Sequence, residues 1–316
     1  MRTLGRRGCR IIKVPLSHRL SAVPAPPEGE PRAATPPTVL ALLNNNLFYK
    51  TFYTLQRQPV KNMTNKQDYI GVFDSGVGGI SVLRHLRTEL PMERFLYFGD
   101  SANAPYGTRP TAEIRALTLA AARTLMDRGC KALVVACNTA TAAAIEDLRQ
   151  QYPDKIIIGI EPALKIASDH FPGSAVGVMA TPATLRETKF ARLLSRFENH
   201  CQVVKLPAAG LVELVEVGKG NSPEAEDLLR PLLSPYKNQL SAVVLGCTHY
   251  PFAAGTISRL LGEETVLLDG GPGTARETRR RLTEAGLLGD GPGEVIIENS
   301  ANCPDITARC RALLEE

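Results

Sequence analysis

From residue 69 onward, short apolar runs that end in a polar residue alternate with stretches of helical spacing. The runs at residues 69–73, 95–99, 132–136 and 156–160 are followed by Asp74, Asp100, Cys137 and Glu161. Runs that are apolar on both faces are typical of buried parallel strands. Segments 80–90, 112–128 and 140–151 carry apolar residues at helical spacing. The alternation predicts an α/β fold with an open parallel sheet.

The second half of the chain repeats this pattern. Residues 174–185 resemble residues 69–80, and the two apolar runs that end at Cys137 and Cys247 are 110 positions apart. Two features with nearly the same offset indicate an internal duplication. We therefore expect two pseudo-symmetric open parallel-sheet domains that face each other across an active-site cleft. The first domain would comprise residues 69–165 and 265–316, and the second residues 166–264.

Residues 1–62 differ from the rest in composition. The first 68 residues hold 11 of the chain's 37 Lys/Arg and 3 of its 32 Asp/Glu. Residues 69–316 therefore hold 26 Lys/Arg and 29 Asp/Glu, a slight excess of negative charge. We interpret residues 1–62 as a disordered leader or as the product of a misassigned start upstream of Met63; an Arg-rich transit peptide is a further alternative. The body gives no electrostatic case for a nucleic-acid partner. Since no window reaches the roughly 18 apolar residues of a membrane span, we expect no membrane partner.

The seven cysteines are scattered and include no Cys-x-x-Cys pair. This pattern argues against a disulfide framework and against a zinc site, so we expect no metal and a reducing cytoplasmic location. Four of them, at positions 130, 201, 303 and 310, are interpreted as small buried hydrophobes.

Polar residues follow nearly every expected strand. In open parallel sheets, ligands bind outside the carboxyl ends of the strands. The residues at those ends are Asp74-Ser75, Asp100-Ser101, Cys137-Asn138-Thr139, Glu161, Thr181 and Cys247-Thr248-His249. The turn at residues 74–79 is rich in glycine but matches neither nucleotide-binding fingerprint. It favours a small carboxylate as the ligand.

Cys137 and Cys247 are candidate catalytic residues. We expect each to open a helix, where backbone N–H groups lower the pKa of a thiol. A single nucleophilic cysteine with His249 as its base would leave the second cysteine unexplained. Two thiols on opposite walls of a cleft suit racemisation or epimerisation without a cofactor, because one removes a proton while the other delivers one. His249 is then the acid–base partner of Cys247, and Asp74 that of Cys137. The alternatives are a purely structural His249 that bonds to the backbone at a helix start and an Asp74 that serves only as an N-cap.

Five motifs resemble those of bacterial glutamate racemases, in the same order and over roughly residues 69–285. They are Asp-Ser-Gly-Val-Gly-Gly at 74–79, Tyr-Phe-Gly-Asp-Ser-Ala-Asn-Ala-Pro-Tyr-Gly at 97–107, Ala-Cys-Asn-Thr-Ala-Thr at 136–141, Gly-Ile-Glu-Pro at 159–162 and Gly-Cys-Thr-His-Tyr-Pro at 246–251. The resemblance implies interconversion of L- and D-glutamate for peptidoglycan synthesis, without pyridoxal phosphate. It implies that Cys137 deprotonates D-glutamate and Cys247 deprotonates L-glutamate, with Asp74 and His249 as proton relays.

The resemblance also implies a substrate-binding set and partners. The set holds the carboxylates and amino group of glutamate and consists of Asp74, Ser75, Tyr106, Gly107, Asn138, Thr139, Thr248 and His249. Glu216 matches an acidic residue close to the site, with an exposed helical glutamate as the alternative. A homodimer and activation by a cell-wall precursor are further implications. The competing interpretations are a racemase of aspartate or a hydantoin, and a two-domain binding protein whose cysteines are structural.

Overall fold

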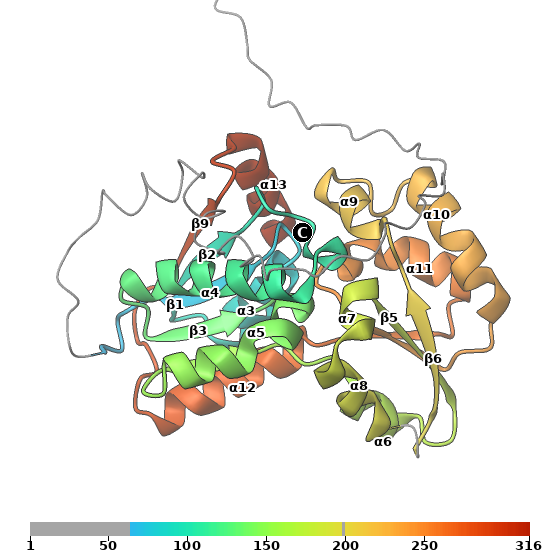
Figure 1. Ribbon diagram of the computed structural model, residues 1–316, viewed down its shortest axis with the longest axis horizontal. Coiled ribbons are helices and arrows are strands. Elements are labelled where there is room, and N and C mark those ends of the chain that lie inside the picture. Colours follow the sequence, from blue (N-terminus) through green and yellow to red (C-terminus); the bar gives the residue numbers. More distant parts are fainter. Residues whose placement is uncertain (1–63, 198–199) are drawn as a thin grey trace, which may run out of the picture. The chain divides into compact units, whose positions relative to one another are not determined.

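The computed structural model describes residues 64–197 and 200–316. The expectations for residues 1–62 lie outside this part of the chain. Within it, the chain forms two α/β domains, each built on an all-parallel sheet (Figure 1). This confirms the predicted fold class.

The first sheet, sheet A, has the strand order β4-β3-β1-β2-β9. Its strands are β1 (Ile70–Asp74), β2 (Arg94–Gly99), β3 (Ala132–Val135), β4 (Ile156–Gly159) and β9 (Glu294–Asn299). Alternate residues of β1 enter different core clusters. Val72 packs with the cluster that contains residues of α3 (Ile80–Glu89) and α12 (Gly271–Glu284). Phe73 packs with the cluster of α4 (Thr111–Asp127) and α5 (Asn138–Gln151). Burial on both faces explains why these strands read as continuous apolar runs.

The second sheet, sheet B, has the strand order β6-β5-β7-β8. Its strands are β5 (Ala175–Ala180), β6 (Gln202–Pro207), β7 (Ala242–Leu245) and β8 (Val266–Asp269). This order repeats β2-β1-β3-β4 of sheet A when β5 is matched to β1. Cys137 and Cys247 then occupy equivalent places, each two residues beyond the last residue of the matched strands β3 and β7. The shared topology accounts for the repeated sequence pattern.

Helices cover both faces of sheet B as well. They are α6 (Leu164–His170), α7 (Pro182–Arg186), α8 (Thr188–Ser195), α9 (Leu211–Glu216), α10 (Pro223–Leu233) and α11 (Ala254–Leu261). The chain ends with α13 (Pro304–Glu315), and short 3-10 helices lie at η1 (Tyr106–Thr108), η2 (Ser234–Tyr236) and η3 (Tyr250–Ala253). The predicted helices at 80–90, 112–128 and 140–151 are confirmed as α3, α4 and α5.

One expected boundary is wrong. Residues 265–269 were expected to return the chain to the first domain, but β8 pairs with β7 in sheet B. The return follows Asp269, where α12 begins and packs against α3, and β9 then pairs with β2. The sequence around β8 did not show this because a fourth parallel strand at the edge of either sheet has the same apolar pattern.

No helix in the described part of the chain has the length and apolar character that a membrane crossing requires.

Candidate active site

The loop after β1 meets the loop after β7, so residues from both sheets come together. Thr248 Oγ1 donates a hydrogen bond of 2.9 Å to Asp74 Oδ2, and Ser81 Oγ donates one of 2.9 Å to the carbonyl of Thr248. The Val77 amide donates at 2.8 Å to Glu216 Oε1 on α9. The predicted cysteines, at the ends of β3 and β7, are both buried.

Glycines at positions 76 and 78 make this approach possible. A Cβ atom on Gly76 would lie 1.9 Å from Glu216 Oε1, and one on Gly78 would lie 2.3 Å from His249 Nδ1. The glycine-rich turn therefore gives room to side chains of the second domain. The glycines thus allow close packing between the two domains of the chain, a role that the motif itself did not indicate.

Cys137 is the N-cap residue of α5, as expected. The Ala140 amide donates to its Sγ at 3.4 Å, and Ser75 Oγ lies 3.6 Å from the same atom. The expected lowering of its pKa is wrong for this structure. Burial, reinforced by the charge of Asp74, raises the pKa of Cys137 to about 12 in spite of the two hydrogen bonds. Cys137 is therefore held as a neutral thiol.

Cys247 does not open an α-helix, contrary to the expectation. It precedes a turn, and His249 is the N-cap residue of the 3-10 helix η3. His249 Nδ1 lies 3.8 Å from Cys247 Sγ, and His249 Nε2 lies 2.7 Å from Glu216 Oε1. Burial disfavours the imidazolium, but the hydrogen bonds to Cys247 and Glu216 and their charges outweigh burial and raise the pKa of His249 well above its usual value. The two sides of the site thus differ in their acid–base groups.

Asp74 is fully buried below the turn that carries Ser75. Its Oδ1 accepts a hydrogen bond of 2.9 Å from the Gly76 amide, and its Oδ2 accepts the bond from Thr248. Burial raises the pKa of Asp74, although His249 and these two hydrogen bonds oppose the shift. The hydrogen bonds of Asp74 therefore go to the glycine turn and to Thr248, next to Cys247. The negative charge of Asp74 acts on Cys137 by raising the pKa of its thiol.

The remaining predicted binding residues have different surroundings. Asn138 is buried, and neither atom of its side-chain amide has a partner among the described residues, which leaves a donor and an acceptor for a ligand. Tyr106 is buried and donates a bond of 2.7 Å to Asp100 Oδ2. Gly107, half-buried, packs so closely on Thr181 that a Cβ atom would lie 2.9 Å from its Cβ.

Thr139 belongs to a cluster of hydroxyls that sequence analysis only partly identified. Its Oγ1 lies 3.2 Å from Thr181 Oγ1 and 2.9 Å from Thr184 Oγ1, and all three residues are buried. Thr181 was noted as a strand-end residue, whereas Thr184 was missed. The signal for Thr184 is its place one turn after Thr181, which caps α7. Glu161, also a strand-end residue, instead lines a separate cavity.

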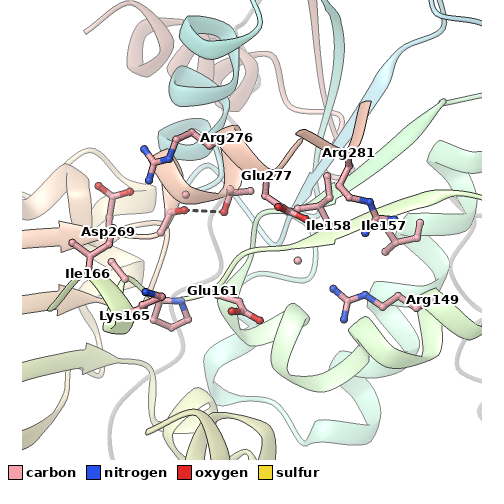
Figure 2. Close-up of a pocket in the computed structure, with 16 residues that line it drawn as sticks. Arg149, Ile157, Ile158, Glu161, Lys165, Ile166, Asp269, Arg276, Glu277 and Arg281 are labelled. Carbon is pink, nitrogen blue, oxygen red and sulfur yellow. Dashed lines mark hydrogen bonds between the residues drawn. The ribbon is translucent and has the colours of Figure 1, made fainter. Parts of the chain in front are cut away.

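That separate cavity has a volume of about 400 Å³ and lies where the chain crosses between the domains, after β4 and after β8. Figure 2 shows Arg149 from α5, Lys165 from α6 and Arg276 from α12 among its lining residues. Its charged lining residues are Arg149, Lys165, Arg276, Arg281, Glu161, Asp269 and Glu277. Arg276 and Arg281 form no ion pair with an acid in the described part of the chain. These two arginines are therefore free to meet an anion there, whereas Arg149 pairs with Glu146 and Lys165 pairs with Asp169.

Comparison with known proteins places this arrangement in a family. Residues 78–278 match the family model for Asp/Glu/Hydantoin racemases, so the chain belongs to this family of racemases. The chain is 44% identical over 256 residues to the glutamate racemase of Clostridium botulinum, covering 80% of this chain and 99% of that protein. It is 50% identical to the Clostridium novyi glutamate racemase, with 73% and 90% covered. Within the family, the chain is a member of the glutamate racemases.

Solved structures agree with this assignment. The Thermus thermophilus glutamate racemase, in complex with β-chloro-D-alanine, is 38% identical, with a TM-score of 0.67 over 79% of this chain and 93% of that one. The Francisella tularensis glutamate racemase, in complex with D-glutamate, is 28% identical, with a TM-score of 0.70 over 79% and 95%. The Escherichia coli enzyme, in complex with L-glutamate and the activator UDP-MurNAc-Ala, is 30% identical, with a TM-score of 0.61 over 72% and 98%.

Proposed function

We propose that the chain interconverts L- and D-glutamate by a two-base mechanism in which Cys137 and Cys247 act on opposite faces of Cα. The observation that carries this proposal is the equivalent position of the two buried cysteines in two sheets of the same strand order. The charge of Cys247 contributes to the raised pKa of Cys137, so the two sulfurs lie within electrostatic range of each other. The duplicated fold thus supplies one acid–base group for each face of a single carbon.

The acid–base states of the two sides suit the direction from L- to D-glutamate. An imidazolium at His249, held by Glu216, is a counter-ion for a thiolate at Cys247. This thiolate removes the Cα proton of L-glutamate, and the neutral thiol of Cys137 delivers its own proton to the opposite face. The product is D-glutamate, with Cys247 protonated and Cys137 ionised. Proton exchange with solvent through His249 and Asp74 restores the starting state.

The intermediate carbanion requires electrostatic stabilisation, because a Cα proton beside a carboxylate is a very weak acid. Asn138 offers an unpaired amide, and Ser75 Oγ lies 3.6 Å from Cys137 Sγ. Thr139 and Thr248, which follow Cys137 and Cys247 in the sequence, offer two further hydroxyls. With Asp74, Tyr106, Gly107 and His249, these groups are our proposed substrate-binding set. No cofactor is needed for this chemistry, because both proton transfers use side chains of the protein.

The mechanism is tested by following circular dichroism of purified L-glutamate with the folded, reduced protein. The signal should decay to zero, because the enantiomers are equally stable. In deuterated water, the D-glutamate formed in the first turnovers should carry deuterium at Cα. Absence of decay at millimolar substrate would refute racemisation. The same assay with L-aspartate separates glutamate from the alternative substrates.

We further propose a role in supplying D-glutamate for peptidoglycan in the cytoplasm, as a homodimer. Support comes from the family and from the six described cysteines, all free thiols, which suit a reducing compartment. Depletion of the protein in its native cell should cause a cell-wall defect that external D-glutamate relieves. Light scattering of the purified protein should give twice the mass of one chain; a single-chain mass would refute the dimer.

Regulation by an anionic cell-wall precursor is a second proposal, and the cavity in Figure 2 is its candidate site. The Escherichia coli enzyme was solved with such an activator, UDP-MurNAc-Ala. The arginines and the lysine of this cavity suit a diphosphate, and the volume of about 400 Å³ falls in the range of small-molecule pockets. The activator should raise turnover of the wild type but not of Arg276→Ala. Arg279→Ala, on the same helix but paired with Glu89, should respond normally. Equal activation of both variants would refute this site.

A further inference from the structure

Tyr97 is a fully buried tyrosine of β2 that lies below the glycine turn and has no place in the mechanism above. Its hydroxyl donates a hydrogen bond of 2.6 Å to the carbonyl oxygen of Gly76. Burial, with the charge of Asp74, raises the pKa of Tyr97 well above its usual value, so the hydroxyl keeps its proton and remains a donor. Tyr97 is therefore a permanent anchor for this one carbonyl.

The peptide unit that joins Gly76 to Val77 is held from both sides. Its oxygen accepts the bond from Tyr97 in the first domain, and its N–H donates the bond of 2.8 Å to Glu216 Oε1 in the second. Close packing leaves little freedom around it. A Cβ atom on Gly99 would lie 2.6 Å from the Gly76 oxygen, and one on Gly76 would lie 1.9 Å from Glu216 Oε1.

The chain of hydrogen bonds continues to the catalytic cysteine of the second domain. Glu216 Oε1 also lies 2.7 Å from His249 Nε2, and His249 Nδ1 lies 3.8 Å from Cys247 Sγ. Hydrogen bonds in series polarise one another in a buried setting. A donor on the Gly76 carbonyl thus strengthens the N–H that fixes Glu216, and Glu216 fixes His249.

We propose that Tyr97 is a positioning residue for the Cys247 side of the reaction and acts through the Gly76–Val77 peptide, Glu216 and His249. Tyr97 and the peptide belong to the first domain, whereas His249 belongs to the second. The orientation of the imidazole is therefore fixed by the whole chain of hydrogen bonds only when the two domains are in contact. The inference rests on the proposed two-base mechanism. It assigns a function to a residue that touches neither the cysteines nor, on this geometry, the substrate.

A double-mutant cycle with Tyr97→Phe and Glu216→Gln tests the inference. Tyr97→Phe removes one hydrogen bond, and we expect kcat to fall about 3- to 10-fold, with KM for glutamate nearly unchanged. In the Glu216→Gln background, the same change should cost less than about twofold, because the chain is already interrupted. Independent, multiplicative effects of the two substitutions would overturn the proposal.

Tyr250→Phe is the matched control. Tyr250 is also fully buried and donates a bond of 3.0 Å to a backbone carbonyl, that of Ala208, which does not bond to Glu216. Its substitution should lower thermal stability to a similar extent, and its effect on kcat should multiply with that of Glu216→Gln. Equal coupling of both tyrosines to Glu216 would show general loosening and would also overturn the proposal.

A titration of His249 by NMR separates this inference from the proposed mechanism, because it needs no turnover. In Tyr97→Phe, the pKa of His249 should fall, since Glu216 is less firmly held against the imidazole. Tyr250→Phe should leave it unchanged. Site-specific 3-fluorotyrosine at position 97, a stronger donor, should raise it and provides the test if Tyr97→Phe does not fold. An unchanged His249 pKa in these proteins would refute the role of Tyr97, whereas absence of racemisation by the wild type would refute the mechanism instead.

Discussion

Glu216 Oε1 receives both the Val77 amide at 2.8 Å and the imidazole of His249 at 2.7 Å. One oxygen atom on α9 thus joins the glycine turn of the first domain to His249, whose Nδ1 lies 3.8 Å from Cys247 Sγ in the second. Glu216 is the least buried member of this group, with 18% of its side chain exposed. Glu216 therefore contacts solvent as well as both domains, through Val77 in the first and His249 in the second.

Glu216→Gln should lower the pH at which activity is lost on the alkaline side. The charge and hydrogen bond of Glu216 help to raise the pKa of His249 above its usual value. A neutral amide removes the charge, so the imidazolium is lost at a lower pH. We expect kcat to fall on the order of 10- to 100-fold near neutral pH and the alkaline limb of the pH profile to move down. A profile of wild-type shape would show that His249 does not govern this limb.

Any substitution must change kcat/KM for L-glutamate and for D-glutamate by the same factor. Because enantiomers have the same free energy in water, the equilibrium constant is unity, and kcat/KM is equal for L- and D-glutamate in every variant. The difference between the Cys137 and Cys247 sides can therefore appear only in kcat and KM taken separately, or in isotope exchange. Experiments on single residues need to be read with this constraint.

Cys137→Ser and Cys247→Ser should each abolish racemisation in both directions, since each reaction needs one base and one acid. Each variant keeps one thiol, and that thiol can still exchange the Cα proton of one enantiomer with solvent. In deuterated water, Cys247→Ser should label D-glutamate and Cys137→Ser should label L-glutamate, without racemisation. NMR of the recovered substrate measures this label. Substantial turnover by either variant contradicts the two-base mechanism, and reversed labelling contradicts the assignment of the faces.

The paired sheets and the places of the two cysteines could be predicted because strand, turn and helix leave strong local patterns. Buried parallel strands must be apolar on both faces, and their carboxyl ends must carry the ligand-binding residues. The edge strand β8 could not be assigned to a domain, because its sequence fits either sheet. The protonation state of Cys137 was misjudged for a related reason. Its helix position is local, whereas its burial is a property of the whole fold and has the larger effect.

The contacts between the two domains also could not be predicted from the sequence. Thr248 bonds to Asp74 across 174 positions, and Val77 bonds to Glu216 across 139. Nothing in the spacing of the motifs indicates which residues of one domain face which of the other. The glycines at 76 and 78 were interpreted as room for a ligand, although the atoms nearest to them belong to Glu216 and His249.

Asp74→Asn should reduce activity but raise thermal stability. Folding raises the pKa of Asp74, chiefly through burial. Protonation therefore favours the folded state. This contribution is complete below the unfolded pKa of about 4 and is lost as the pH rises through the higher folded value. Near neutral pH the buried carboxylate opposes folding, and a neutral amide of the same shape removes this cost.

Melting curves of wild type and Asp74→Asn at several pH values measure this effect. The variant should melt at a higher temperature near neutral pH, and the difference should vanish in acid, where Asp74 of the wild type is protonated. Asp100→Asn is a useful comparison, because Asp100 is also fully buried and accepts three side-chain hydrogen bonds, two from Asn103 and one from Tyr106, whereas Asp74 accepts one from a side chain and one from a backbone amide. A lower melting temperature for Asp74→Asn near neutral pH would contradict a destabilising charge.

Gly78→Ala should separate folding from catalysis. An added Cβ would lie 2.3 Å from His249 Nδ1 and 2.6 Å from Thr248 Oγ1, so the turn and the Cys247 loop must move apart. Both domain cores lie outside this contact, and we expect the circular dichroism spectrum of the folded protein to be preserved. Displacement of His249 by about 1 Å should lower kcat/KM on the order of 100-fold. Near-normal turnover in Gly78→Ala would show that the close contact between the glycine turn and His249 is not required for the reaction.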